Sequence, residues 1–289
     1  MRHGVLGAGG VGGFLGASFA RAGREVVLVL RPESLARYDG RMRVESALLG
    51  SFDVEVPAAP VLDRPVDVLW VTTKATQLEA ALALVPAERV DEAVVVPLLN
   101  GIDHVQLLRT RLRAERVLPG TIYVESERVD VGRIRQKTAF VELELAPHPH
   151  ASALRAEVED VGLGCGIGAT ESAVLWRKLA TLAPIALTTT ALPGPISSVV
   201  SDPAWHRRLE ACVREVASIA AAEGVEFDAD AVLERYEQIG DLRSSMQKDR
   251  EAGRPLELDA IGGAVLRAAR RHGLQAPATT ELVELIQAS

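Results

Sequence analysis

Cysteine is nearly absent from this sequence of 289 residues, which contains only Cys165 and Cys212. Two thiols this far apart do not follow a metal-ligand spacing, and they cannot form the framework of a disulfide-stabilised fold. The sequence therefore predicts no bound metal, and it is typical of a protein that works in a reducing compartment.

Blocks of basic residues are also absent, and the formal net charge is −7. Proteins that bind nucleic acids usually present a strongly basic surface, so we expect no nucleic-acid partner. The first residues, Met1-Arg2-His3, lead directly into the apolar run Gly4-Val5-Leu6. This start lacks the charged, apolar and small-residue regions of a signal peptide, so we expect a cytoplasmic location.

One uncharged stretch, residues 179–201, is long enough to span a bilayer. It contains Pro184, Pro193, Gly194 and Pro195 together with several threonines and serines. Because proline interrupts a helix, these residues favour a buried helix that ends near Pro193 over a membrane span. We expect no membrane partner.

The first half of the chain alternates short apolar runs with segments of helical spacing. The predicted strands are residues 2–6, 25–30, 67–72 and 93–97, and the predicted helices between them include residues 11–22 and 76–84. Such alternation is typical of a parallel sheet covered by helices on both faces. Residues 121–145 contain two β-rich runs around Gly132, which we interpret as a meander at the end of this sheet.

After Gly168 the strand signals largely stop and helical patterns follow. The predicted helices are residues 172–190, 205–223, 229–238, 258–272 and 279–287. The sequence therefore predicts an α/β protein with a Rossmann-type dinucleotide-binding domain at residues 1–168 and an all-α domain at residues 169–289. The boundary falls in the glycine-rich connection of residues 162–170.

The run Gly7-Ala8-Gly9-Gly10-Val11-Gly12 has the GxGxxG pattern, and it follows a predicted strand and opens a predicted helix. In this context Gly7 permits a tight turn, Gly9 lets the backbone approach a pyrophosphate, and Gly12 lets the helix pack close to the strand. The amide groups at the start of the helix, including those of Gly10 and Val11, would face the phosphates. The alternative is a glycine-rich turn without a ligand.

The end of the second predicted strand distinguishes between the two nicotinamide cofactors. Enzymes that use NAD usually carry an acid there, which binds the ribose 2′-hydroxyl. Here the strand ends in Val29-Leu30-Arg31, and a guanidinium suits a 2′-phosphate. Arg31 therefore predicts NADPH, and the less favoured alternative is a solvated surface residue.

Two adjacent cations, Arg177 and Lys178, precede the long uncharged run. Neighbouring residues on a helix point about 100° apart, so one of them can reach solvent while the other turns inward. Burial disfavours the charged form of a lysine and lowers its pKa, which suits a general acid for a carbonyl group. The alternative is a lysine that extends along the helix edge to reach water.

Further downstream, Glu257 and Ser245 allow both a functional and a structural interpretation. Glu257 lies at the start of a predicted helix, where a carboxylate is stabilised by the helix dipole, but it could also pair with an inward lysine. Ser245 could cap a helix or bind a substrate carboxylate.

These segments together resemble the ketopantoate reductase (2-dehydropantoate 2-reductase) family over nearly the whole chain. The matching segments, in order, are Val5–Gly12, Arg31, Val71–Ala75, Leu98–Ile102, Pro119–Thr121, Leu175–Ala180, Ser244–Met246, Glu257–Asp259 and Arg270–Gly273. The combination at family-like spacing is much more specific than any single motif.

The resemblance implies NADPH-dependent reduction of a small 2-oxo acid, ketopantoate, to pantoate in pantothenate biosynthesis. It implies that Lys178 donates a proton to the carbonyl oxygen, that Glu257 orients the lysine and the substrate, and that Ser245 binds substrate. Asn100 and Lys74 match residues at the cofactor ribose and the active-site cleft, and Asn100 is also a substrate residue. The oligomeric state implied is a monomer or a homodimer.

Two positions depart from the family pattern. Where the family commonly has asparagines one and two turns after the catalytic lysine, this chain has Leu182 and Ala186, and Ile196 lies nearest to a third expected asparagine. The chemistry is therefore retained while the groups that recognise a hydroxyl are not. Alternatives are a related reductase of another 2-oxo acid, an opine-type dehydrogenase, or a non-catalytic NADP-binding sensor.

Overall fold

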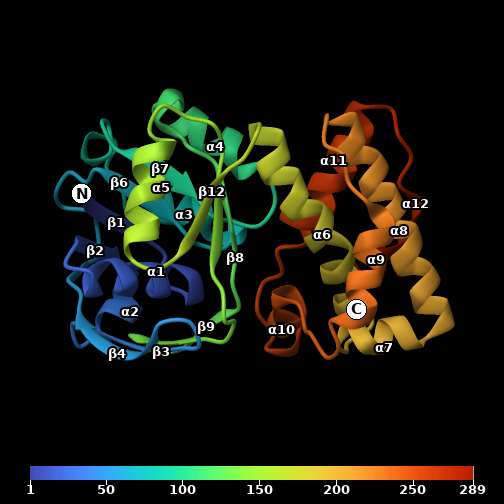
Figure 1. Ribbon diagram of the computed structural model, residues 1–289, viewed down its shortest axis with the longest axis horizontal. Helices are drawn as coiled ribbons and strands as arrows, with labels where there is room; N and C mark the ends of the chain where they lie inside the picture. Colours follow the sequence, from blue (N-terminus) through green and yellow to red (C-terminus); the bar gives the residue numbers. More distant parts are fainter. Residues whose placement is uncertain (289) are drawn as a thin grey trace. The chain divides into compact units, whose positions relative to one another are not determined.

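The computed structural model describes residues 1–288, and its contacts divide the chain into two compact units. The first unit comprises Met1–Leu99 and His104–Val174. The second comprises Asn100–Asp103 together with the chain from Leu175 onward. All strands of the described residues lie in the first unit, and the second is helical (Figure 1). The predicted fold class, an α/β Rossmann-type part followed by an all-α part, is confirmed.

The first unit is built on a five-stranded parallel sheet with the strand order β5-β2-β1-β6-β7. Its strands are β1 (Arg2–Leu6), β2 (Glu25–Val29), β5 (Ala58–Ala59), β6 (Val68–Val71) and β7 (Val94–Pro97). Four of the five were predicted, because their valine- and leucine-rich runs are typical of strands buried on both faces. The fifth, β5, has two residues and carries no such signal.

The helices of this unit connect the strands and cover the sheet. They are α1 (Gly10–Arg21), α2 (Pro32–Leu35), α3 (Leu78–Leu82), α4 (His104–Arg111) and α5 (Ala151–Asp160), with short 3₁₀ turns η1 (Ala75–Gln77), η2 (Ala87–Arg89) and η3 (Ala114–Arg116). With β1 in the centre of the sheet and β2 and β6 beside it, the connections follow the doubly wound pattern.

The predicted meander of residues 121–145 is wrong. Strands β8 (Gly120–Tyr123) and β11 (Glu142–Leu145) pair with each other and form a separate sheet with β12 (Gly164–Ile167). The hairpin between them, β9 (Ser126–Asp130) and β10 (Arg133–Gln136), leaves this sheet and pairs with β3 (Arg41–Ser46) and β4 (Gly50–Glu55). Helix α1 packs against β1 and β2 and also against this second sheet, which lies at the lower edge of the unit in Figure 1.

A buried aromatic stack stabilises the first strand. The ring of His3 stacks on Phe19 with a centroid distance of 4.2 Å, and His3 Nδ1 accepts a hydrogen bond from Trp70 Nε1 at 3.1 Å. Because Nδ1 is an acceptor, the imidazole is neutral and carries its proton on Nε2. Burial lowers the pKa of His3 to about 4, although the charge of Glu157 opposes this shift.

The second unit consists of helices connected by short loops. They are the part of α6 (Glu171–Ala191) from Leu175 onward, α7 (Ile196–Ser201), α8 (Pro203–Ala222), α9 (Ala229–Gln238), α10 (Ser245–Glu251), α11 (Ala264–Arg271) and α12 (Pro277–Gln287). Helix α6 includes Pro184 and ends before Pro193, so the predicted helix break is confirmed. Within residues 1–288, no helix combines the length and the apolar character that crossing a bilayer requires.

One predicted helix of this unit differs in its first turn. Residues 258–272 were expected to form one α-helix, but Asp259–Gly263 form a π-helical turn, η4, before α11 begins. Single π-turns inside helices are uncommon and frequently accompany functional sites. Glu257 lies two residues before this turn begins at Asp259, which makes the segment a candidate for the site.

Candidate functional site

The glycine-rich segment forms a tight turn between β1 and α1. Gly7 has a φ of +97°, and a Cβ at this position would lie 2.8 Å from the side chain of Thr73. A Cβ at Gly12 would lie 2.1 Å from Thr72 Oγ1 and 2.3 Å from the carbonyl oxygen of Gly7. Only glycine therefore fits at these two positions, and α1 starts in direct contact with the end of β1.

The start of α1 has the properties of a phosphate-binding site. Gly9 is the N-cap residue, no side chain among residues 1–288 caps the helix, and the first turn of the helix contains no acidic residue. A Cβ on Gly9 would meet nothing within 4 Å, whereas one on Gly10 would lie 2.1 Å from the carbonyl oxygen of Ser126. The uncapped amide groups of the first turn, including that of Val11, carry a partial positive charge. This open, side-chain-free helix start fits the pyrophosphate of a dinucleotide.

The topology of the sheet places Arg31 and Lys74 at the same edge as this turn. Arg31 follows β2 and Lys74 follows β6, and these two strands flank β1. In a parallel sheet the carboxyl ends of neighbouring strands lie at one edge. Arg31 is exposed and Lys74 is half-buried. The sheet therefore brings together three of the segments that were selected from the sequence.

Thr72 and Thr73, at the end of β6, were not selected from the sequence. Thr72 Oγ1 donates a hydrogen bond to the carbonyl oxygen of Gly7 at 2.8 Å, which fixes the glycine turn. Thr73 Oγ1 is buried and has no hydrogen-bond partner among the described residues. The signal that could have identified them is a pair of polar residues directly after a buried strand.

Lys178 and Arg177 differ in their environment, as the helical geometry predicts. Arg177 is exposed and Lys178 is half-buried on α6. Burial lowers the pKa of Lys178 to about 8, while the negative charge of Glu257 raises it. A lysine with this pKa releases a proton near neutral pH, which is the property that a general acid requires.

Glu257 is held in place by Asn100. Glu257 is buried, with 4% of its surface exposed, and its Oε2 accepts a hydrogen bond from Asn100 Nδ2 at 3.2 Å. Asn100 belongs to the same unit as Lys178 and Glu257. A buried carboxylate needs hydrogen bonds or an opposite charge, and Asn100 and Lys178 supply these. Three residues predicted for catalysis or substrate binding thus form one cluster.

Ser245 is the first residue of α10, and its side chain is exposed. The cap of this helix is the preceding residue, Ser244, whose Oγ accepts a hydrogen bond from the backbone of Gln247. Ser244 Oγ also lies 2.9 Å from Thr189 Oγ1 of α6. The capping role considered for Ser245 therefore belongs to Ser244.

Leu182 and Ala186 follow Lys178 at intervals of one turn along α6. Leu182 is half-buried, whereas Ala186 is completely buried and presents no surface. The hydroxyls that could replace the missing amides are engaged elsewhere. Thr181, Thr188 and Thr189 donate to carbonyl oxygens of their own helix. Ser197 donates to Asp241.

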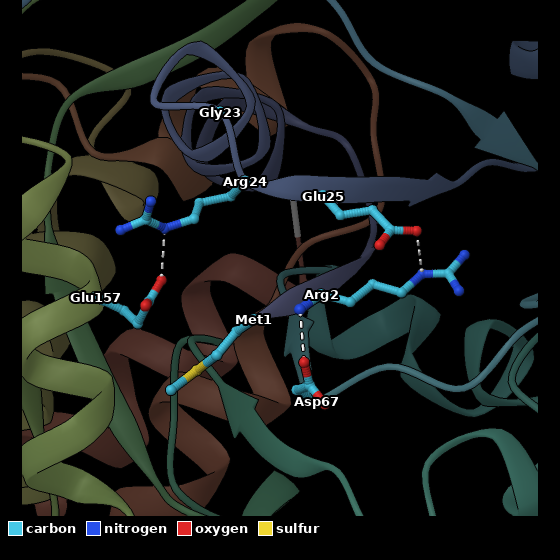
Figure 2. A pocket seen from close by; sticks show the side chains of 7 residues that line it. All are labelled: Met1, Arg2, Gly23, Arg24, Glu25, Asp67 and Glu157. Atoms are coloured by element: carbon cyan, nitrogen blue, oxygen red, sulfur yellow. Dashed lines mark hydrogen bonds and ion pairs between the residues drawn. The ribbon is translucent and has the colours of Figure 1, made fainter.

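A hollow at the opposite edge of the parallel sheet does not have the properties of a site (Figure 2). Its charged groups are paired with one another: Arg24 Nε lies 2.9 Å from Glu157, and Arg2 Nε lies 3.2 Å from Glu25. The backbone N–H of Arg2 donates to Asp67. The guanidinium groups of Arg24 and Arg2 therefore already have carboxylate partners in this hollow, and we assign no ligand to it.

Comparison with known proteins identifies the family of this fold and cluster. The family described as "Ketopantoate reductase PanE/ApbA" matches residues 3–150, and its C-terminal part, "Ketopantoate reductase PanE/ApbA C terminal", matches residues 172–289. The chain belongs to the ketopantoate reductase family. It is therefore an oxidoreductase, a nicotinamide-dependent reductase that acts on a small molecule.

Full-length relatives of the ketopantoate reductase family agree with this assignment. The 2-dehydropantoate 2-reductase of Caulobacter vibrioides is 30% identical over 294 residues, which cover 99% of this chain and 98% of that protein. Among solved structures, a ketopantoate reductase from Ralstonia eutropha has a TM-score of 0.91 at 25% identity and covers 100% of this chain and 98% of its own. The 2-dehydropantoate 2-reductase of Geobacter metallireducens has a TM-score of 0.89 at 25% identity, and both chains are covered completely.

Proposed function

We propose that this ketopantoate reductase family member catalyses the NADPH-dependent reduction of a 2-oxo acid, with ketopantoate as the first candidate substrate. Residues 1–168 would bind the dinucleotide, and residues 169–289 would carry the catalytic groups. The observation that supports this proposal most strongly is the half-buried Lys178, whose pKa burial lowers to about 8 beside the buried carboxylate of Glu257.

The cofactor, when bound, supplies the hydride. The residues of the chain that would hold it are Gly7, Gly9, Gly10, Val11 and Gly12 at the pyrophosphate, with Arg31 at the 2′-phosphate and Lys74 and Asn100 nearer the ribose. The uncapped helix start and the exposed guanidinium of Arg31 support this assignment. The matching of charge to the 2′-phosphate is the reason for choosing NADPH over NADH.

The proton comes from the chain itself. Lys178 Nζ would donate a proton to the carbonyl oxygen of the substrate while the carbonyl carbon is reduced, which yields the hydroxyl of the product. Glu257 would keep the lysine charged and oriented, and Asn100 would fix the carboxylate in turn. The exposed hydroxyl of Ser245 would bind the substrate carboxylate, together with the lysine.

The side chain of the 2-oxo acid substrate is not determined by these catalytic groups. One observation favours a second candidate substrate. Leu182 is half-buried one turn after Lys178, and the neighbouring hydroxyls are engaged within the unit. The side chain of Leu182 cannot form a hydrogen bond with a substrate hydroxyl, and a hydroxyl is selected only where the site binds it through hydrogen bonds. A 2-oxo acid with an apolar side chain is therefore the alternative to ketopantoate.

The experiment is an assay of NADPH oxidation with a panel of 2-oxo acids that includes ketopantoate. Oxidation with at least one 2-oxo acid supports the proposal, and the ranking of the panel identifies the side chain. Tight NADPH binding without turnover of any compound would instead indicate a non-catalytic sensor. Turnover only in the presence of an amino acid as second substrate would indicate an opine-type dehydrogenase.

A further inference from the structure

A single guanidinium connects the turn that carries Asn100 to the turn that follows Glu257. Arg267, in α11, donates hydrogen bonds from Nε and Nη2 to Asp103 Oδ2 at 3.0 and 2.7 Å. Its Nη1 donates to Asp259 Oδ1 at 2.6 Å, and Nη2 donates to the carbonyl oxygen of Asp259 at 2.8 Å. Asp103 and Asp259 lie a few residues after Asn100 and Glu257 in the sequence, so Arg267 bridges both segments.

The two segments also fit together sterically. Gly101 has a φ of +84°, and a Cβ there would lie 2.2 Å from the carbonyl oxygen of Ala260 in η4. At Gly263, a Cβ would lie 2.5 Å from Asp259 Oδ1 and 3.0 Å from Arg267 Nη1. The backbones at Gly101 and Ala260 therefore approach each other closely only because residue 101 is glycine, and Gly263 leaves room for the contact between the side chains of Asp259 and Arg267.

The exposure of these groups argues against a role in folding stability alone. The side chain of Arg267 is 34% exposed and that of Asp103 is 44% exposed. Ion pairs of this exposure contribute little to the free energy of unfolding. A planar guanidinium bonded to two segments, in contrast, fixes their relative geometry. The π-helical turn that it holds is an uncommon conformation at the position next to the buried Glu257.

We propose that Arg267 is a positioning residue for the catalytic cluster. By bridging Asp103 and Asp259, it keeps the amide of Asn100 against the carboxylate of Glu257. The carboxylate then stays at the position from which it orients Lys178. This inference rests on the proposed function, in which Lys178 is the proton donor, but its structural part can be tested without turnover.

The kinetic test compares Arg267→Gln with Arg208→Gln. Arg208 is a matched control because it pairs with Glu281 at 2.8 Å in the same unit, with exposures of 35% and 48%. We expect Arg267→Gln to lower kcat about ten- to a hundredfold, since small misplacements of reacting groups cost this much, while KM for NADPH and Tm stay close to those of the control. Equal kcat values for the two variants would overturn the proposal.

The test without turnover uses the small number of lysines. The chain has four, Lys74, Lys137, Lys178 and Lys248, so ¹³Cε-lysine NMR gives four titrations, and the signal missing from Lys178→Met assigns the catalytic one. Loss of the Arg267 charge alone would raise the pKa of Lys178, because a nearby cation disfavours the ammonium form. Movement of the Glu257 carboxylate away from Lys178 would lower the pKa of Lys178. A lower pKa of Lys178 in Arg267→Gln is therefore the expected result.

Gly101→Ala provides a variant that changes no charge. Its Cβ would push the turn away from Ala260, so we expect a lower Lys178 pKa and the same loss of kcat as in Arg267→Gln. An unchanged or raised pKa in both variants would overturn the positioning role. A wild-type protein that reduces no 2-oxo acid but shows the pKa shift would instead contradict only the proposed function.

Discussion

The amide of Asn100 donates a hydrogen bond to the carboxylate of Glu257 at 3.2 Å, although 157 residues separate the two in the sequence. This contact places a buried negative charge where it acts on Lys178, whose pKa falls to about 8 because of burial and is held up by Glu257. The protonation of the lysine thus depends on the position of one carboxylate.

The pH dependence of the reaction follows from this pair. We expect kcat/KM for reduction to be high below pH 8 and to fall as the pH rises through about 8, because Lys178 then loses the proton that it donates. In Glu257→Gln the charge that raises the lysine pKa is removed, so the fall should begin at a lower pH. Profiles of both proteins that fall at the same pH would contradict the pairing.

Replacement of the lysine should separate chemistry from cofactor binding. We expect Lys178→Ala to reduce turnover by about 10²–10⁴-fold, which is the usual contribution of a general acid, while NADPH still binds in a fluorescence titration. Arg177→Ala is the control, because Arg177 is the adjacent cation on the exposed side of α6. If Lys178→Ala retained near-normal turnover, the lysine would have only a structural role.

The choice of cofactor should depend on Arg31. A charge-assisted contact contributes about 1.5–3 kcal/mol, so Arg31→Ala should weaken NADPH binding about ten- to a hundredfold. NADH binding should stay nearly unchanged, because NADH has no 2′-phosphate. The measurement is Kd for each cofactor with both proteins. An equal loss with NADPH and NADH would show that Arg31 does not recognise the phosphate.

The side chain of the substrate can be tested with two compounds that differ by one hydroxyl. We expect kcat/KM for 2-oxo-3,3-dimethylbutanoate to equal or exceed that for ketopantoate, because Leu182 offers no hydrogen bond to the hydroxyl. Leu182→Asn should shift the preference towards ketopantoate. A wild-type preference for ketopantoate of about a hundredfold or more would show that the hydroxyl is still recognised.

The buried His3 should make the stability of the chain depend on pH. Its pKa of about 4 lies below the ordinary value of 6.5, so the unfolded chain binds more protons between these values. The free energy of unfolding should therefore fall as the pH drops from 6.5 to 4. In His3→Asn, whose amide oxygen can still accept from Trp70, urea unfolding should show a shallower dependence. The same slope in both proteins would exclude His3 as the cause.

Much of the fold could be predicted because its signals are local. The apolar runs of β1, β2, β6 and β7 and the periodic pattern of α9 can be recognised without knowledge of distant residues. The pairing of β10 with β3 could not be predicted, because strand partners are chosen by tertiary packing. The π-helical turn η4 could not be predicted either, because the spacing of its apolar residues is that of an ordinary α-helix.

The candidate site likewise combines features that local sequence signals predict with features that depend on tertiary packing. The glycine turn follows from a motif, and helical geometry predicts that Arg177 and Lys178 do not share one face, although it does not specify which of the two turns inward. The contact between Asn100 and Glu257, the complete burial of Ala186 and the bridge made by Arg267 depend on how distant segments pack. No pattern in the sequence specifies these contacts.

The grouping of Asn100–Asp103 with the helices rather than with the sheet limits how this protein can be dissected. A gene fragment that starts at Leu175 would encode the helices without the turn that supplies Asn100. A fragment that ends at Val174 would carry this turn without Glu257. A single cut therefore cannot yield two self-sufficient modules, and exchanging the helical half between homologues would require transplanting a four-residue insert from the other half.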